Sequence, residues 1–144
     1  MKNKFLIRVL SILCLVLLVA AVAVLPSGCT VTKDDAQIVD STEKTVLGEG
    51  KTVFDFSVTT PDNVKKNFEI HTDKTVVGDA ILELSLISGE ESQYGLYVKT
   101  VDGTTLNFEK DGKYWAFYVD GSYGVSGVDS TQIVAGSHYE FRAE

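Results

Sequence analysis

The side chains that could bind a ligand or do chemistry are concentrated near the C-terminal end of this sequence. The stretch GKYWAFYVDGSYGVSGVD, residues 112–129, places Tyr114, Trp115, Phe117 and Tyr118 within five positions and follows them with glycines. Tyrosine and tryptophan combine a large apolar ring with one polar group, which is typical of binding surfaces. This stretch is therefore the first candidate for a binding site.

The histidines are the second candidate. His138 and Glu140 are two positions apart, so they share one face of a predicted strand and could contribute two metal ligands. A third ligand would have to come from another strand, for example His71. The alternative, which the sequence favours, is a solvated polar face without a metal.

No catalytic motif accompanies these residues. Glycines 121, 124 and 127 are spaced G-x-x-G-x-x-G, but no βαβ pattern surrounds them, so they indicate hairpin geometry rather than phosphate binding. Neither a nucleophile-elbow nor a phosphate-loop motif is present. We therefore predict no catalytic residue and expect no enzyme.

The N-terminus predicts export. Residues 1–28 have the layout of a secretory signal peptide: basic residues, an almost wholly apolar run over 9–25, and small residues before Cys29. A cysteine after a small residue is similar to the lipobox of bacterial lipoproteins, so Cys29 is the predicted lipidation site. An uncleaved anchor over 5–25 and ordinary secretion are the alternatives. All three place the rest of the chain outside the cell membrane, and the lipid anchor would hold it on the outer face.

Charge excludes one class of partner. The sequence has 13 Lys and Arg against 20 Asp and Glu, and the three basic residues before position 28 leave with the signal peptide, which gives a net charge of −10. Nucleic acid repels such a surface, so no nucleic-acid partner is expected.

Residues 29–46 are polar at first and without periodicity, and we predict a lipidated cysteine and flexible tether there, followed by one domain over 47–144.

Hydrophobic periodicity predicts the elements of that domain. Alternation over 51–60 and 67–72, with a Pro-Asp-Asn turn between them, indicates two strands of a hairpin. Residues 76–87 fit either a helical face or a strand, and their length and the position of Asp79 favour a helix. Strands are predicted again over 94–103, 113–121 and 137–144. The order of strands, helix and more strands indicates the α+β class.

Parity then assigns the aromatic residues to two faces. Trp115 and Phe117 are the more apolar pair and are expected to face the helix, so Tyr114 and Tyr118 are expected to face outward. Ala116 between the tyrosines predicts a shallow recess. By the same parity Tyr97 is expected to join them. A second small core under the glycine-rich loop is the alternative.

The quoted stretch, VVGDAILEL, YGLYVKTVDG and the closing AGSHYEF together resemble the transcobalamin C-terminal-like domain family over residues 47–144. The resemblance implies a β-grasp-like mixed sheet with one helix packed on one face. It also makes cobalamin a ligand to consider, although no cofactor is otherwise expected.

These features predict a cell-surface lipoprotein that acts as a non-catalytic binding module for a small molecule such as a corrinoid, a glycan or a protein partner. The predicted ligand-binding residues are Tyr97, Tyr114, Tyr118 and Tyr123, of which Tyr123 lies in the glycine-rich loop. The alternative is a structural or adhesive envelope protein without a small ligand.

Overall fold

Strands supply most of the structure between residues 39 and 144, which are the residues that the computed structural model describes. The strands are β1 (Val39–Gly48), β2 (Thr52–Thr59), β3 (Val64–Thr72), β4 (Ile87–Ser92), β5 (Gly95–Val101), β6 (Thr104–Thr105), β7 (Trp115–Val119), β8 (Ser122–Tyr123) and β9 (His138–Ala143). The helices are α2 (Val77–Glu83), α3 (Phe108–Asp111) and the 3-10 turn η1 (Val128–Ser130).

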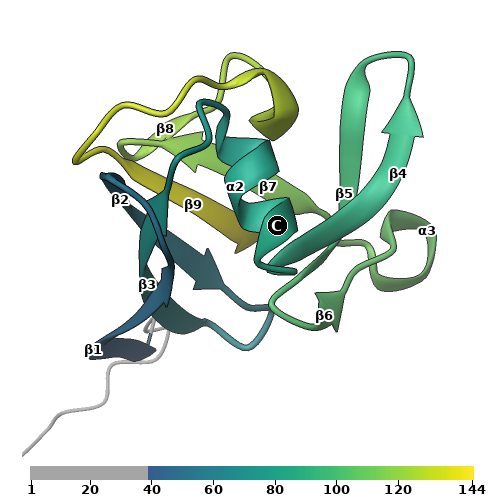
Figure 1. Cartoon of the computed structure of the whole chain (residues 1–144). Coiled ribbons are helices and arrows are strands. Elements are labelled where there is room, and N and C mark those ends of the chain that lie inside the picture. Colours follow the sequence, from purple (N-terminus) through teal and green to yellow (C-terminus); the bar gives the residue numbers. More distant parts are fainter. Residues whose placement is uncertain (1–38) are drawn as a thin grey trace, which may run out of the picture. The chain divides into compact units, whose positions relative to one another are not determined.

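The strands form two sheets (Figure 1). The larger is mixed and six-stranded, in the order β1-β3-β2-β9-β7-β8, with parallel β1/β3 and β2/β9 pairs. The predicted β2–β3 hairpin is confirmed, because the two strands pair antiparallel from Thr52–Thr72 to Thr59–Lys65. The predicted single sheet is incomplete, since β4, β5 and β6 form a separate three-stranded sheet. The fold is thus mostly β, with few helices.

The described structure begins earlier than the expected domain boundary at residue 47. Strand β1 starts at Val39 and pairs with β3 along its length, with a bulge between Asp40 and Lys44. The predicted signal peptide and Cys29 lie outside the described residues. Residues 36–144 form one compact unit with its own core, so this unit can be studied separately. Within residues 39–144, no helix is long and apolar enough to span a bilayer.

The predicted helix is present but ends early. Its apolar face, with Val77, Ala80 and Ile81, is buried as expected from the helical period. The helix stops at Glu83 because Ser85 adopts a positive φ of 57° and Leu86 donates its N–H back to the carbonyl of Ile81. This turn frees the next residues to begin β4.

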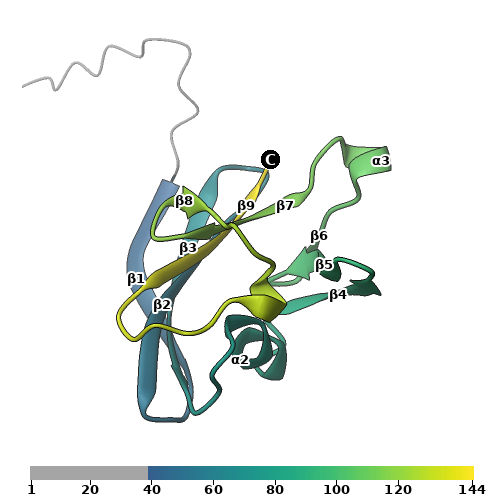
Figure 2. The same ribbon diagram turned by 90° about the horizontal axis from the view of Figure 1, so that it is seen from above.

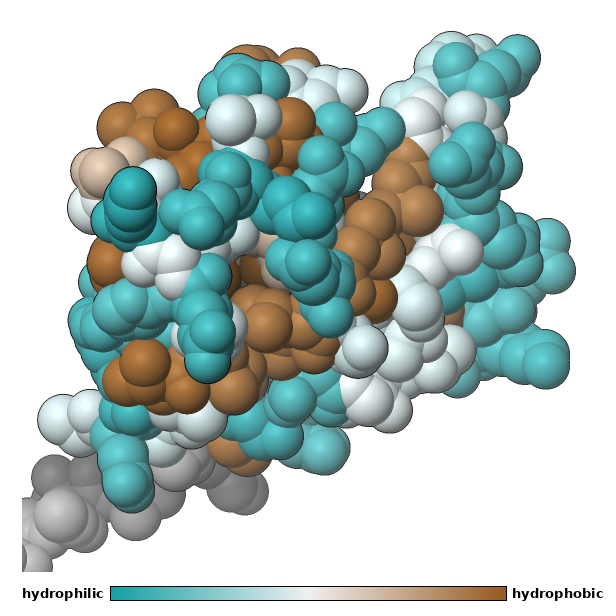
Figure 3. Space-filling view, viewed as in Figure 1, coloured by the Kyte–Doolittle hydropathy of each residue, from teal (hydrophilic) through white to brown (hydrophobic). Residues whose placement is uncertain are grey.

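Helix α2 and the smaller sheet cover the same face of the six-stranded sheet (Figure 2). Gly78 lets the helix approach η1 closely, since a Cβ there would lie 2.9 Å from the Cα of Asp129. A hydrophobic band runs between α2 and the β4–β5 hairpin in the space-filling view (Figure 3). Leu84 and Leu96 are among the half-buried residues that pack against the core.

The core assignment of the aromatic strand is confirmed. Trp115 and Phe117 are buried and face the core, together with Tyr139 and Phe141 of β9. The rings of Phe117 and Tyr139 are stacked, with 6.3 Å between their centroids. Alternation along β7 therefore correctly predicted its core face.

Candidate functional site

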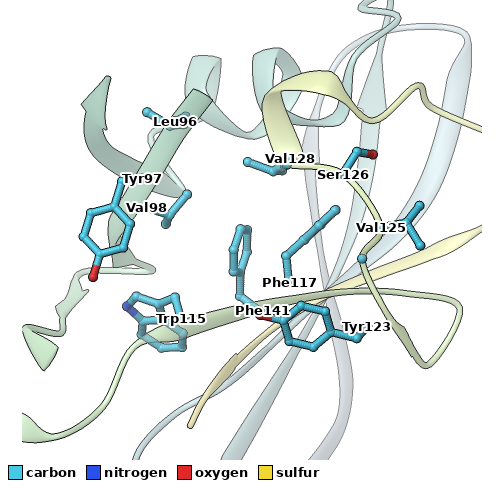
Figure 4. A pocket seen from close by; sticks show the side chains of 12 residues that line it. Leu96, Tyr97, Val98, Trp115, Phe117, Tyr123, Val125, Ser126, Val128 and Phe141 are labelled. Carbon is cyan, nitrogen blue, oxygen red and sulfur yellow. The ribbon is translucent and has the colours of Figure 1, made fainter. Parts of the chain in front are cut away.

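A cavity of about 340 Å³ opens between the two sheets, beside the predicted aromatic strand (Figure 4). One wall comes from β5, the floor from β7 and β9, and the other wall from the loop after β8. The lining residues are Leu96, Tyr97, Val98, Trp115, Phe117, Tyr123, Gly124, Val125, Ser126, Gly127, Val128 and Phe141. The volume is within the usual range for small-molecule sites.

The glycine-rich loop forms its wall by lying directly on β7. The N–H of Gly124 donates to the carbonyl of Phe117 at 2.8 Å. A Cβ on Gly124 would lie 2.8 Å from the Phe117 ring, so glycine is required at this position. The next residue, Val125, is fully exposed at the rim. The sequence predicted a loop here that would border a site, and the cavity lies under it.

Trp115 contributes an unpaired polar atom to this site. Its side chain is 7% exposed, and its Nε1 has no hydrogen-bond partner. In Figure 4 the nitrogen is turned toward the edge of the cavity that Tyr97 forms. Buried N–H groups are nearly always paired, so an unpaired one indicates a place where a partner is bound or where energy is lost.

The predicted site residues divide into two groups. Tyr97 and Tyr123, which are 46% and 57% exposed, line the cavity with Trp115. Tyr114 and Tyr118 do not line it, because they point to the other face of β7. The expectation that Tyr97 joins Tyr114 and Tyr118 is therefore not met, since β5 belongs to the smaller sheet and packs on the core side.

The outer tyrosines are engaged with charged neighbours. The guanidinium of Arg142 lies over the Tyr118 ring, with 4.1 Å between Cζ and the ring centroid. The hydroxyl of Tyr118 donates to the carboxylate of Glu144. The Tyr114 hydroxyl donates to the same carboxylate at 3.5 Å. The pKa of Tyr114 is raised chiefly by nearby Tyr123, and the pKa of Tyr118 chiefly by its hydrogen bond to Glu144.

The recess predicted at Ala116 is not open. Ala116 is only 1% exposed, and its cross-strand partner on β9 is Arg142. Spacing along one strand could not indicate this burial, because the neighbouring strand comes from a distant part of the sequence.

The face of β9 with His138 and Glu140 was expected to be solvated, and this expectation is wrong for Glu140. Its side chain is 2% exposed and accepts hydrogen bonds from Thr59 at 2.8 Å and Arg142 at 2.7 Å, with Lys65 at 3.7 Å. Burial would raise the pKa of Glu140, but the hydrogen bonds from Arg142 and Thr59, together with the positive charges of Lys65 and Arg142, hold the pKa below its ordinary value.

His138 forms a pair that sequence reasoning missed. Its Nε2 lies 2.7 Å from the Oγ of Ser57, which is the distance of a nucleophile and its base. However, Ser57 is fully buried and neither residue lines the cavity, so a substrate cannot reach the hydroxyl there. Burial lowers the pKa of His138, and nearby Lys65 lowers it further. The pair is a structural hydrogen bond between β2 and β9.

The part of the chain that the structure describes contains no cluster of side chains that could bind a metal ion. Among residues 39–144, no three side chains of His, Cys, Asp or Glu lie close enough together to hold an ion. The third ligand considered from sequence, His71, is instead 2.8 Å from Glu69 on its own strand.

Comparisons with known proteins agree with this fold. Residues 73–143 match the sequence model of a family described as a domain of unknown function, DUF4430. A search of the curated proteins finds no match. One similar crystal structure is that of a candidate metal-binding protein from Ruminococcus gnavus ATCC 29149, at 26% identity and a TM-score of 0.62 over 65% of this chain and 97% of that chain.

A second similar structure is haptocorrin in complex with Cbi, at 20% identity and a TM-score of 0.54. The match covers 65% of this chain but only 25% of haptocorrin, so this likeness concerns one part of that protein and shows the fold alone. This likeness of fold is consistent with the resemblance noted in the sequence. The first of these proteins is described as metal-binding, and the second was solved with Cbi bound.

Proposed function

We propose that this chain is a non-catalytic binding module that takes a small molecule in the cavity between β5, β7 and the loop after β8. The observation that carries the proposal is the cavity itself: aromatic side chains from two sheets meet a glycine-rich loop around about 340 Å³. Ligand sites are usually concave and mostly apolar, with a few placed polar groups. This site is concave and has aromatic walls, although its exposed lining is somewhat more polar than apolar, and Trp115 Nε1 is a buried donor beside it.

We further propose that Cys29 carries the lipid that holds the module on the outer face of the membrane. The support is the sequence pattern before Cys29. A module held there would meet ligands arriving from outside the cell. Corrinoids are one class to test, because of the likeness to haptocorrin, which was solved with Cbi; glycans are another.

Tyr114 and Tyr118 are a second candidate site, for a protein partner rather than a small molecule. The Tyr118 ring packs edge-on against the ring of Tyr123, which also lines the cavity, with 5.4 Å between the centroids. We place this candidate second because both hydroxyls already bond Glu144.

Trp115 gives a direct experiment, because it is the chain's single tryptophan. Residues 36–144 would be titrated with cobalamins, sugars and divalent metals while Trp115 emission and the thermal midpoint are recorded. A cavity ligand should change both, and at about 100 times its Kd it should stabilise the fold by about 2.7 kcal/mol. Free tryptophan with the same compounds controls for optical artefacts. If neither quantity changes for any compound, the structural or adhesive role becomes the better proposal.

A further inference from the structure

The cavity is uncharged along its whole lining. None of its twelve lining residues is Asp, Glu, Lys, Arg or His. Two charged groups lie close to it. The Lys99 ammonium is 6.0 Å from the centre of the Tyr97 ring but only 2.6 Å from Glu90. The Asp129 carboxylate lies against Gly95 and Gly127, where Oδ2 accepts the Leu96 N–H and the buried Oδ1 has no partner, and Asp129 does not line the cavity. A charged ligand group would lose its water here without gaining an opposite charge, which is strongly unfavourable.

The Trp115 indole supplies a donor without an acceptor. Its Nε1 is buried with no partner, and the nitrogen is turned toward the Tyr97 edge of the cavity (Figure 4). An indole N–H can only donate. The complementary group on a ligand is therefore an acceptor, such as a carbonyl or a ring nitrogen.

The walls favour a flat group. Phe117 and Phe141 form the floor, and the Tyr97 ring stands at one edge. Aromatic rings gain most from another ring or planar system placed against their faces or edges. On the opposite side the loop has only small residues at 124, 126 and 127, so it does not fill the space that such a group needs.

We infer that the cavity selects an uncharged, flat group that carries a hydrogen-bond acceptor, and that Trp115 Nε1–H donates to this acceptor. The inference rests on the proposed function, because it names the ligand class of the same cavity. It excludes anions and bare cations as the part of the ligand that enters.

The test uses four naphthalene probes of one shape: 2-naphthamide, 2-naphthoate, 2-naphthamidinium and 2-ethylnaphthalene. Residues 36–144 would be titrated by NMR, where the single tryptophan gives one indole N–H resonance. The neutral acceptor probe, 2-naphthamide, should bind about five- to tenfold more tightly than 2-ethylnaphthalene, the usual effect of one hydrogen bond, and should shift that resonance downfield. Both charged probes should bind at least about tenfold more weakly than the amide.

The variant Trp115→Phe isolates the donor. Affinity for 2-naphthamide should fall to that for 2-ethylnaphthalene, whose own affinity should stay within about twofold. If the variant does not fold, the inference is still tested on the wild type, by the order of probe affinities and by the shift of the indole N–H resonance. A charged probe that binds as well as the amide, or an amide that leaves the indole resonance unmoved, overturns the inference. If another class of ligand then binds at the cavity, the proposed function stands; if nothing in the wider panel binds, both fail.

Discussion

The side chain of Asp129 links the two walls of the cavity by a hydrogen bond. Its Oδ2 accepts the backbone N–H of Leu96 at 3.1 Å, and so joins η1, at the end of the glycine-rich loop, to the start of β5. Two glycines leave room for this carboxylate: a Cβ at Gly95 would lie 2.5 Å from Oδ2, and one at Gly127 would lie 2.4 Å from Oδ1. The bond therefore sets the width of the cavity between its two walls.

Replacing Asp129 should loosen that connection. Asp129→Ala should lower the free energy of unfolding by about 1–3 kcal/mol, because a charge-assisted hydrogen bond is lost and the Leu96 N–H is left unpaired. Asp129→Asn keeps a carbonyl acceptor, so its free energy of unfolding should fall by less than that of Asp129→Ala. Urea unfolding and amide hydrogen exchange at Leu96 measure both effects. Equal losses for the two variants would show that the bond to Leu96 is not what Asp129 contributes.

A methyl group at Gly127 should act through the same carboxylate. The backbone there has a φ of −62°, which alanine adopts without strain, so the only conflict is with Oδ1. Gly127→Ala should therefore destabilise the wild type by about 1 kcal/mol or more but cost little in an Asp129→Ala background. Fully additive losses in that double-mutant cycle would contradict this reading.

Binding and stability should separate at the tyrosines. Tyr97→Ala should weaken cavity binding by about 1–2 kcal/mol, and it should change the free energy of unfolding by less than about 0.5 kcal/mol because the side chain is nearly half exposed. Tyr114→Ala is the matched control, since Tyr114 lies on the other face of β7. Titration and urea unfolding of both variants test this. A loss of binding in the Tyr114 variant alone would move the site to the outer face.

Acid should destabilise the domain in two stages. The folded state holds the pKa of His138 below 6.5 and that of Glu140 below 4.5. In both cases the unfolded chain takes up the proton first, so stability is full above the unfolded pKa and falls as the pH drops toward the lower folded value. The first stage thus begins below about pH 6.5 and the second below about pH 4.5.

Two variants assign these stages. His138→Gln should remove the upper stage and keep the lower, whereas Glu140→Gln should keep the upper stage and weaken the lower. Urea midpoints measured across the acid range give the comparison. An upper stage that persists in His138→Gln would assign it to another group.

The anchor is tested at Cys29. Cys29→Ala should move the protein from the detergent phase to the aqueous phase in phase separation, because two or more acyl chains hold a protein on a membrane stably. Ordinary secretion predicts aqueous partitioning for the wild type as well. Unchanged detergent partitioning of the variant would instead assign the anchor to the uncleaved segment over residues 5–25.

Much of the fold follows from local periodicity. Alternation along β7 placed Trp115 and Phe117 on the buried face, where the structure has them. These assignments succeed because successive side chains of a strand point to opposite faces wherever the strand lies. The helical face with Val77 and Ile81 succeeds for the same reason with a period of 3.6.

The candidate site depended on packing between elements distant in the sequence. Only the separation of β4–β6 into its own sheet brings Tyr97 to Trp115 and leaves Tyr118 behind β7. Likewise, only β9 beside β2 turns Glu140 from a presumed surface charge into a buried acceptor of Thr59. The sequence by itself determined which face of each strand is apolar, because that is a local property of the chain. Which faces meet, and where a cavity remains between them, was decided by the tertiary structure, because partners across strands are chosen by the burial of the whole core.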